Sequence, residues 1–245
     1  MDFNKMLFAE KSKLNEHVLI HWIRSSPTPL SFAPAMSFFV LGFKDLLLNL
    51  EYPQANTTLE KAVNHHCKED LEHWQLFLDD LETMNVGQSA WGAKTTTALR
   101  QIWSNDNWRV RQATYKLMSL TFQPNSPGVK LLMIECLELA FAVFIAAVRA
   151  SDSHSPEALK YFGDHHFFEE ASHQQGSWID ETHQLDLNEL ELTEEESKAA
   201  AMIVLEVFEW FHLMFTSWYK QRAIFTSPSV SMVAKESAVL QPKGI

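Results

Sequence analysis

Apolar residues recur every three to four positions along most of the chain, which is the spacing of helices with one buried face. Polar and proline-containing stretches divide the chain into seven segments that we predict to be helices: 3–23, 31–50, 57–84, 95–121, 128–150, 155–177 and 193–225. Thr57 followed by Glu60 is a capping box, and Thr193 caps the last segment ahead of three glutamates. Since glycine occurs at only 7 positions, the sequence predicts an all-α fold rather than a multi-strand one.

No linker separates these segments, so we expect one domain over residues 1–226 and a polar tail over residues 227–245. Hydrophobic residues make up 46% of the 245 residues, which is enough to form a large core. The formal net charge of −11 argues against nucleic-acid binding, because carboxylates repel phosphates. Cys67 and Cys136 form no Cys-x-x-Cys pair, and the first ten residues lack a signal-peptide pattern. We therefore expect reduced thiols and a cytoplasmic protein.

Two segments are apolar enough to resemble membrane spans. Residues 131–148 contain two glutamates, and residues 199–218 contain two glutamates and a histidine. A charge at the centre of a bilayer costs roughly 2.5–3.5 kcal/mol on insertion scales. We therefore expect both segments to be core helices that carry functional polar groups, with no membrane as a partner.

The sequence His166-Phe-Phe-Glu-Glu170-Ala-Ser-His173 has metal-ligand spacing. At about 100° per residue, positions i, i+4 and i+7 share one helical face. Two imidazoles and a carboxylate suit iron, zinc or manganese, and the absence of thiolates argues against a structural zinc site. The alternative is an exposed polar stripe, and we favour half of a metal site.

A second triad, His66, Asp70 and His73, has the same spacing, and Glu69 lies at the edge of its face. Apolar neighbours on that face indicate that the stripe is directed into the core. A buried carboxylate or imidazole needs a partner or a cation. A core histidine satisfied by a neighbour would explain one such residue, but two triads in one chain favour metal binding.

Glu135 and Glu138 lie one helical turn apart in a segment that is otherwise almost wholly apolar. Burying an unpaired carboxylate costs several kcal/mol. Each buried glutamate must therefore either be protonated or lie beside a cation. A metal ion is the simplest partner. The sequence alone leaves open which of the two glutamates is directed inward.

Glu206, Glu209 and His212 lie on the last predicted helix, and Glu209 with His212 forms a Glu-x-x-His pair. Ferritin-type bundles use such pairs as diiron ligands. Asp70 and His73 would be the matching pair on another helix. This gives a ferritin-like diiron protein as an alternative, although it leaves His166, Glu170 and His173 without a role.

With these motifs identified, the sequence resembles the haem-oxygenase-like diiron oxidase and oxygenase superfamily, which includes the CADD proteins. Members have a carboxylate and a histidine on one helix and a glutamate on a later apolar helix. An aromatic pair then precedes His-x-x-x-Asp/Glu-x-x-His. Tyr161 and Phe162, followed by His166, Glu170 and His173, match this last element, with glutamate in place of the commoner aspartate.

The first two elements match less closely. His73 matches the histidine of the first element, and the glutamate of the second falls on Glu135 or Glu138. Some members have a glutamate seven residues before the first histidine, where this chain has His66; others have a carboxylate three residues before it, where this chain has Asp70. The Glu/His-rich layout also resembles the nitrile-forming diiron enzyme of aetokthonotoxin biosynthesis.

The resemblance implies a haem-oxygenase-like seven-helix bundle with two Fe(II) ions, or a manganese–iron pair, and dioxygen as cosubstrate. It implies an oxidoreductase, commonly a homodimer, that oxidises a small amino acid or organic acid, such as an aromatic amino acid converted to a nitrile in natural-product biosynthesis. No catalytic residues beyond the metal ligands are implied. A metal-free protein like thiaminase II or PqqC and a CADD-like interaction protein remain alternatives.

Overall fold

The computed structural model describes residues 1–84, 95–123, 125–151, 158–164 and 190–222, and these residues contain helices but no strand. The all-α prediction is therefore confirmed for them. In chain order the helices are α1 Phe3–Asn15, α2 Val18–Ser25, the 3-10 helix η1 Ala33–Met36, α3 Ser37–Leu50, α4 Thr58–Asp70, α5 His73–Thr83, α7 Thr95–Trp103, α8 Trp108–Thr121, α9 Pro127–Arg149 and α11 Glu194–Gln221.

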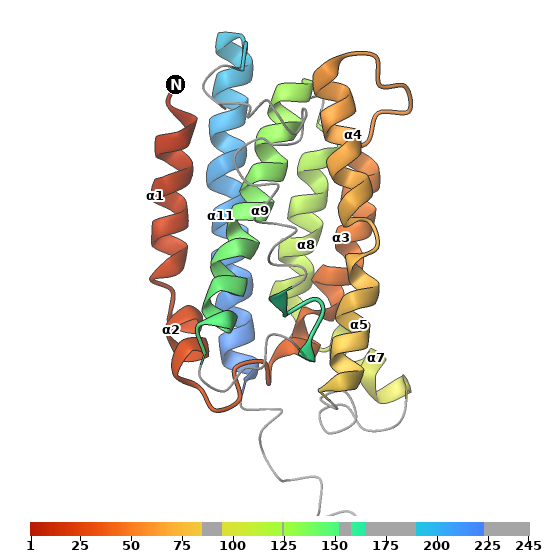
Figure 1. Ribbon diagram of the computed structural model, residues 1–245, viewed down its shortest axis with the longest axis vertical. Coiled ribbons are helices and arrows are strands. Elements are labelled where there is room, and N and C mark those ends of the chain that lie inside the picture. Colours follow the sequence, from red (N-terminus) through yellow and green to blue (C-terminus); the bar gives the residue numbers. More distant parts are fainter. Residues whose placement is uncertain (85–94, 124, 152–157, 165–189, 223–245) are drawn as a thin grey trace, which may run out of the picture.

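The long helices run side by side along the length of the molecule (Figure 1). Helix α11 packs on α8, α9 and α1, while α3 packs on α8 and α4. Helix α9 is buried along most of its length, because α1, α2, α4 and α11 all contact it. A helix that is apolar around its whole circumference needs such surroundings. The expectation that 128–150 is a core helix is confirmed, and any polar side chain on α9 lies in the core.

Two helix starts carry the expected caps. Thr57 Oγ1 accepts a hydrogen bond from the Glu60 amide at 3.2 Å, and Glu60 Oε2 accepts one from the Thr57 amide at 2.8 Å. Thr193 and Glu196 exchange the same pair of bonds at 3.2 and 2.8 Å. Each box satisfies amide groups that would otherwise have no partner in the first turn. These local interactions explain why α4 and α11 begin where the sequence predicts.

Three predicted helices are broken. The segment 3–23 divides between α1 and α2 at His17, whose Nδ1 accepts a hydrogen bond from the Leu19 amide at 3.0 Å as the N-cap of α2. The segment 95–121 divides between α7 and α8, where the Arg111 guanidinium donates to the carbonyl oxygens of Ile102 and Ser104. In both places a side chain satisfies backbone groups that a continuous helix would pair internally.

The third break separates α4 from α5 at Leu71 and Glu72. The pattern of buried positions continues through it, because Val63, Asp70 and Phe77 are all buried and recur every seven residues. A pattern that keeps its period on both sides of a break contains no signal of the break. The expectation of one helix over 57–84 is therefore wrong at this point. Because α5 begins at His73, this histidine does not continue the helical face of His66 and Asp70.

The predicted helix 155–177 is also wrong within its described part, since residues 159–163 are not helical. Asp80 on α5 explains this, because its buried carboxylate accepts hydrogen bonds from the amides of Lys160 at 2.8 Å and Phe162 at 2.9 Å. These bonds satisfy the backbone in an irregular conformation. They attach the segment to α5 and bury Tyr161 and Phe162.

Three helical stretches of the described residues are long and apolar enough to cross a membrane by length and composition: Ala33–Leu50, Pro127–Arg149 and Glu194–Gln221. In an apolar 18-residue window of each stretch, 56%, 78% and 44% is buried within the structure. The absence of a membrane partner stays a prediction, based on the carboxylates that the second and third stretches contain.

Candidate metal centre

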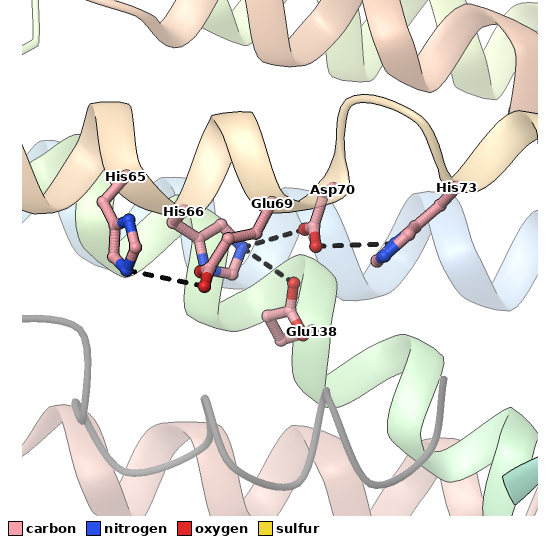
Figure 2. A network of polar contacts seen from close by, with 6 residues as sticks. All are labelled: His65, His66, Glu69, Asp70, His73 and Glu138. Carbon is pink, nitrogen blue, oxygen red and sulfur yellow. Dashed lines mark hydrogen bonds and ion pairs between the residues drawn. The ribbon is translucent and has the colours of Figure 1, made fainter. Parts of the chain in front are cut away.

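Three side chains from two helices meet in the core. His66 and Asp70 project from one face of α4, and Glu138 projects toward them from α9 (Figure 2). His66 Nε2 lies 2.9 Å from Glu138 Oε1 and 3.0 Å from Asp70 Oδ2. One ligand atom from each residue lies within 4.8 Å of the others, a spacing that one metal ion can bridge. The side chains are at most 4% exposed, so the three residues lie almost completely in the core.

The local sequence explains this arrangement. His66 and Asp70 are one helical turn apart, so they lie on the same side of α4 as the buried residues Val63 and Cys67. Helix α4 packs against α9, and this contact brings them opposite Glu138. Neither helix contains the site alone, since each contributes part of one donor set.

The cluster is strongly coupled electrostatically. Burial, followed by the charge of Asp70, raises the pKa of Glu138 to about 8. Burial alone would also raise the pKa of Asp70, but the adjacent imidazole of His66 outweighs it and lowers that pKa to about 2. Burial opposes a charge on His66, but the two carboxylates raise its pKa well above 6.5. A proton on this imidazole therefore has the position and sign of charge that a metal cation would have.

Buried oxygen atoms in the cluster lack hydrogen bonds, which is the test of whether a cation fits. Glu138 Oε2 is buried and has no hydrogen-bond partner among the described residues. The Asp70 oxygens lie within ion-pair distance of the histidines, yet neither contact has hydrogen-bond geometry. Buried polar atoms are normally satisfied, so unsatisfied carboxylate oxygens around an imidazole fit a bound cation.

His73 lies beside the trio but is not a member of it. Because α5 begins at His73 after the break, its Nδ1 is 3.5 Å from Asp70 Oδ1 and its side chain is 14% exposed. Glu69, the other carboxylate considered for this site, instead lies 3.4 Å from His65 on the exposed side of α4. The structure thus brings His66 and Asp70 together with α9 and leaves Glu69 outside.

Glu135 and Glu138 differ in their surroundings, although both are buried. Glu135 is not one of the three clustered residues. Burial raises its pKa to about 7, and the charges of His66 and Lys11 partly oppose this shift. Its Oε2 atom has no hydrogen-bond partner among the described residues. Of the two glutamates, Glu138 is therefore the one that faces the histidine.

The predicted ligands His166, Glu170 and His173 lie outside the described residues. The aromatic pair that precedes them is described. The ring of Tyr161 lies 5.3 Å from the rings of both Phe77 and Phe141. Tyr161 also lines a cavity together with Asp70 and Glu138.

The ferritin-like alternative gains no support from the described residues. Glu209 and His212 are exposed on α11, where they line a surface groove with Arg109 and Lys220. They do not join Asp70, because the trio described above is the one group of possible metal ligands found among the described residues.

A small, partly open cavity of about 30 Å³ lies beside the trio. Asp70, His73 and Glu138 line one part of it, and Lys44 and Trp74 line another. Sequence reasoning did not identify Lys44 as a functional residue. The sequence feature that could have identified it is the position of this lysine within the largely apolar segment 37–50.

No protein-family model matches the chain, and no curated protein matches it. The functional argument therefore rests on the residues of the site.

Proposed function

We propose that this protein is a non-haem diiron oxygenase or oxidase with a haem-oxygenase-like seven-helix arrangement. Its substrate would be a small amino acid or carboxylic acid, and its cosubstrate would be dioxygen. The observation that carries the proposal is the buried group of His66, Asp70 and Glu138, in which two carboxylates converge on one imidazole. A nitrile-forming reaction on an aromatic amino acid is the narrower form of this proposal.

The donor set supports a redox-active divalent ion. Mixed imidazole and carboxylate ligands suit iron, manganese and zinc, and the free thiols of Cys67 and Cys136 are not among the clustered atoms. Glu138 supports a pair of ions rather than one, because Oε1 contacts His66 while Oε2 has no partner among the described residues. A carboxylate with two available oxygens can bridge two cations.

His66, Asp70 and Glu138 would hold one iron, and His166, Glu170 and His173 are our sequence-based candidates for the second. When bound, two ferrous ions supply the electrons and the coordination positions that dioxygen activation requires. The protein contributes the orientation of its ligands, since the Asp70 carboxylate lies between the two histidines of α4 and α5.

A cavity lies beside this group. Its walls are mostly apolar and Asp70 and Glu138 line part of it, so a substrate would approach the buried carboxylates from this side. His73 is more exposed than the trio and lines the same cavity as Asp70, which it contacts and can orient.

The proposal includes a cytoplasmic protein that binds neither nucleic acid nor membrane and that forms a homodimer. The net charge of −11 supports the first exclusion. The buried free thiols of Cys67 and Cys136 are consistent with a reducing compartment. The homodimer follows from the family resemblance alone.

Anaerobic titration with Fe(II), followed by oxygen-consumption measurements, tests this function. We expect two irons per chain and iron-dependent oxygen uptake, with both reduced in His66→Ala and His173→Ala. His65→Ala is the matched control, because His65 is the neighbouring exposed histidine on the same helix. Loss of iron only in His212→Ala would favour the ferritin-like alternative. No bound iron would contradict the proposal and favour a metal-free binding or interaction protein.

A further inference from the structure

Exposed apolar side chains are concentrated on one side of the bundle, over α3, α7 and α8. Helix α3 packs on α8, and α7 leads directly into α8 (Figure 1). Thirteen large hydrophobic side chains are exposed in the described part of the chain, and seven of them lie on these helices or at their ends: Leu41, Leu48, Leu99, Trp103, Trp108, Tyr115 and Phe122. A concentration of exposed apolar and aromatic side chains is typical of a protein–protein interface. We call this surface the α3/α7/α8 face.

The exposed apolar residues of α3 and α8 recur every seven positions. Trp108, Tyr115 and Phe122 follow one another at this interval on α8 and its C-cap, and Leu41 and Leu48 do so on α3. Seven residues are close to two helical turns, so each set lies on one face of its helix. Apolar stripes with this period are the pattern by which helices pack against each other. The α3/α7/α8 face is therefore suited to a helical partner.

Contacts between side chains join the three helices into one surface. The centroid of the Phe38 ring lies 5.7 Å from that of Trp103 and 5.5 Å from that of Tyr115. The guanidinium carbon of Arg111 lies 5.1 Å from the centroid of the Trp103 ring and 5.7 Å from that of Trp108. These contacts hold the aromatic rings in place before a partner binds, which lowers the entropic cost of association.

The two halves of the face carry charges of opposite sign. Asp45 lies between Leu41 and Leu48 on α3, and Lys116 directly follows Tyr115 on α8. Both charged side chains are exposed, and neither forms an ion pair within the part of the chain that the structure describes. The α3 half is therefore acidic beside its apolar residues, and the α8 half is basic.

Helices α3 and α8 run side by side in the same direction. Gly42 lies against Thr114, since a Cβ atom added to the glycine would be 3.0 Å from Thr114 Cγ2. Further along both helices, Asn49 Nδ2 donates to Met118 Sδ at 3.0 Å. Residue numbers therefore increase in the same direction on both helices, so heights along them can be compared directly.

Asp45 and Lys116 lie at nearly the same height. Asp45 is three residues beyond Gly42, and Lys116 is two residues beyond Thr114, so the heights differ by about 1.5 Å, the rise of one helical residue. A two-fold axis parallel to the helices leaves heights unchanged and places α3 of one copy opposite α8 of the other. Asp45 of each copy then faces Lys116 of the other copy, so the favourable pair occurs twice.

We propose that the α3/α7/α8 face is the surface on which a second copy of this chain docks, around a two-fold axis parallel to the helices. A second copy fits because the face is complementary to itself, with an apolar centre, an acidic α3 half and a basic α8 half. The inference rests on the proposed function in so far as that function includes a homodimer, and it assigns the surface of this homodimer. Docking itself needs no metal.

Sedimentation equilibrium of the full chain tests the apolar part of this surface. We expect the wild type to be a dimer. Phe122→Ser should weaken dimerisation by about 10-fold or more, because each copy loses a phenyl ring that docking buries. Phe8→Ser is the matched control, because Phe8 is 73% exposed on α1, outside the face, and Phe122 is 70% exposed. A monomeric wild type, or equal dimer affinities of the two variants, would overturn the inference.

Charge reversal tests the two-fold arrangement. Asp45→Lys and Lys116→Glu each place like charges opposite each other twice, and each should weaken dimerisation by about 10-fold or more. In an equal mixture of the two variants, a dimer with one chain of each kind again has opposite charges at both contacts. The mixture should therefore regain nearly the affinity of the wild type, which also shows that both variants are folded. Full affinity in either single variant, or no recovery in the mixture, would contradict the arrangement.

Iron titration of the same variants separates this inference from the proposed function. Asp45→Lys, Lys116→Glu and Phe122→Ser should bind as much Fe(II) as the wild type, because none of these residues is a proposed ligand. If the dimer responds to the variants as expected but no iron binds, the docking surface stands and the diiron function fails. If iron binds and the wild type is a monomer, the diiron function stands and the docking surface is wrong.

Discussion

Nε2 of His66 lies 2.9 Å from Oε1 of Glu138, although 72 residues separate the two in the sequence. The contact joins the buried face of α4 to the largely buried helix α9. Because it is buried on both sides, each partner depends on the other for its electrostatic balance.

Replacing His66 by alanine should destabilise the metal-free protein, because it leaves Asp70 and Glu138 buried beside each other without a cation. Removing one member of a buried ion pair typically costs about 3–5 kcal/mol. The free energy of unfolding in urea would measure this loss. His65→Ala should change it by less than about 0.5 kcal/mol, as is usual for exposed positions. Equal stability of the two variants would contradict a coupled buried cluster.

The two glutamates of α9 should differ in their effect on metal binding. We expect Glu138→Gln to weaken metal affinity by more than the roughly 10–100-fold typical of residues that only support a ligand. Glu135→Gln should have a smaller effect, since Glu135 is not one of the clustered residues. Competition titrations against a chelator of known affinity would compare them. The reverse order would assign the bridging role to Glu135.

Asp80 should be needed to hold the irregular segment beside α5. Asp80→Asn replaces one acceptor oxygen by a donor, although both oxygens accept backbone bonds, from Lys160 and Phe162. We expect a loss of about 1–3 kcal/mol in unfolding free energy. Asp79→Asn is the control, because Asp79 is 52% exposed and only pairs with the Lys160 side chain. A loss confined to Asp79→Asn would show that the surface ion pair holds the segment.

Acidification should destabilise the contact between α2 and α11 through His17. Burial, followed by the charge of His212, lowers the pKa of His17 from 6.5 to about 4, so the folded protein keeps this imidazole neutral. Its two nitrogens contact the Leu19 amide and Thr216 Oγ1. Between pH 6.5 and about 4 the unfolded chain binds the additional proton, so stability falls as the pH falls through this window.

Urea unfolding of the wild type and of His17→Asn between pH 4 and pH 7 would measure this effect. Asparagine preserves the N-cap of α2 but does not titrate. The difference in unfolding free energy between the two proteins should therefore shift in favour of His17→Asn as the pH is lowered. A difference that does not change with pH would show that His17 does not carry this dependence.

Part of the candidate site could be predicted from the sequence. The spacing of His66 and Asp70 placed them on one face, and the apolar surroundings of Glu135 and Glu138 indicated buried carboxylates. The choice of Glu138 could not be predicted, because it depends on which side of α9 faces α4. Lys44 could not be connected to the site for the same reason, since it lies on another helix.

The sequence by itself determined the all-helical character of the described residues and the starts of α4 and α11, because periodicity and capping act between residues within a few positions of each other. Only the tertiary structure decided where the helices break and which polar groups meet. Across the break at Leu71 and Glu72, the spacing of buried positions does not change, so the sequence pattern does not reveal the break. At His17 and Asp80, side chains accept backbone hydrogen bonds in place of those that a continuous helix would form. Contacts between distant segments thus decided the site, since the burial of α9 against four neighbouring helices fixes which of its glutamates faces His66.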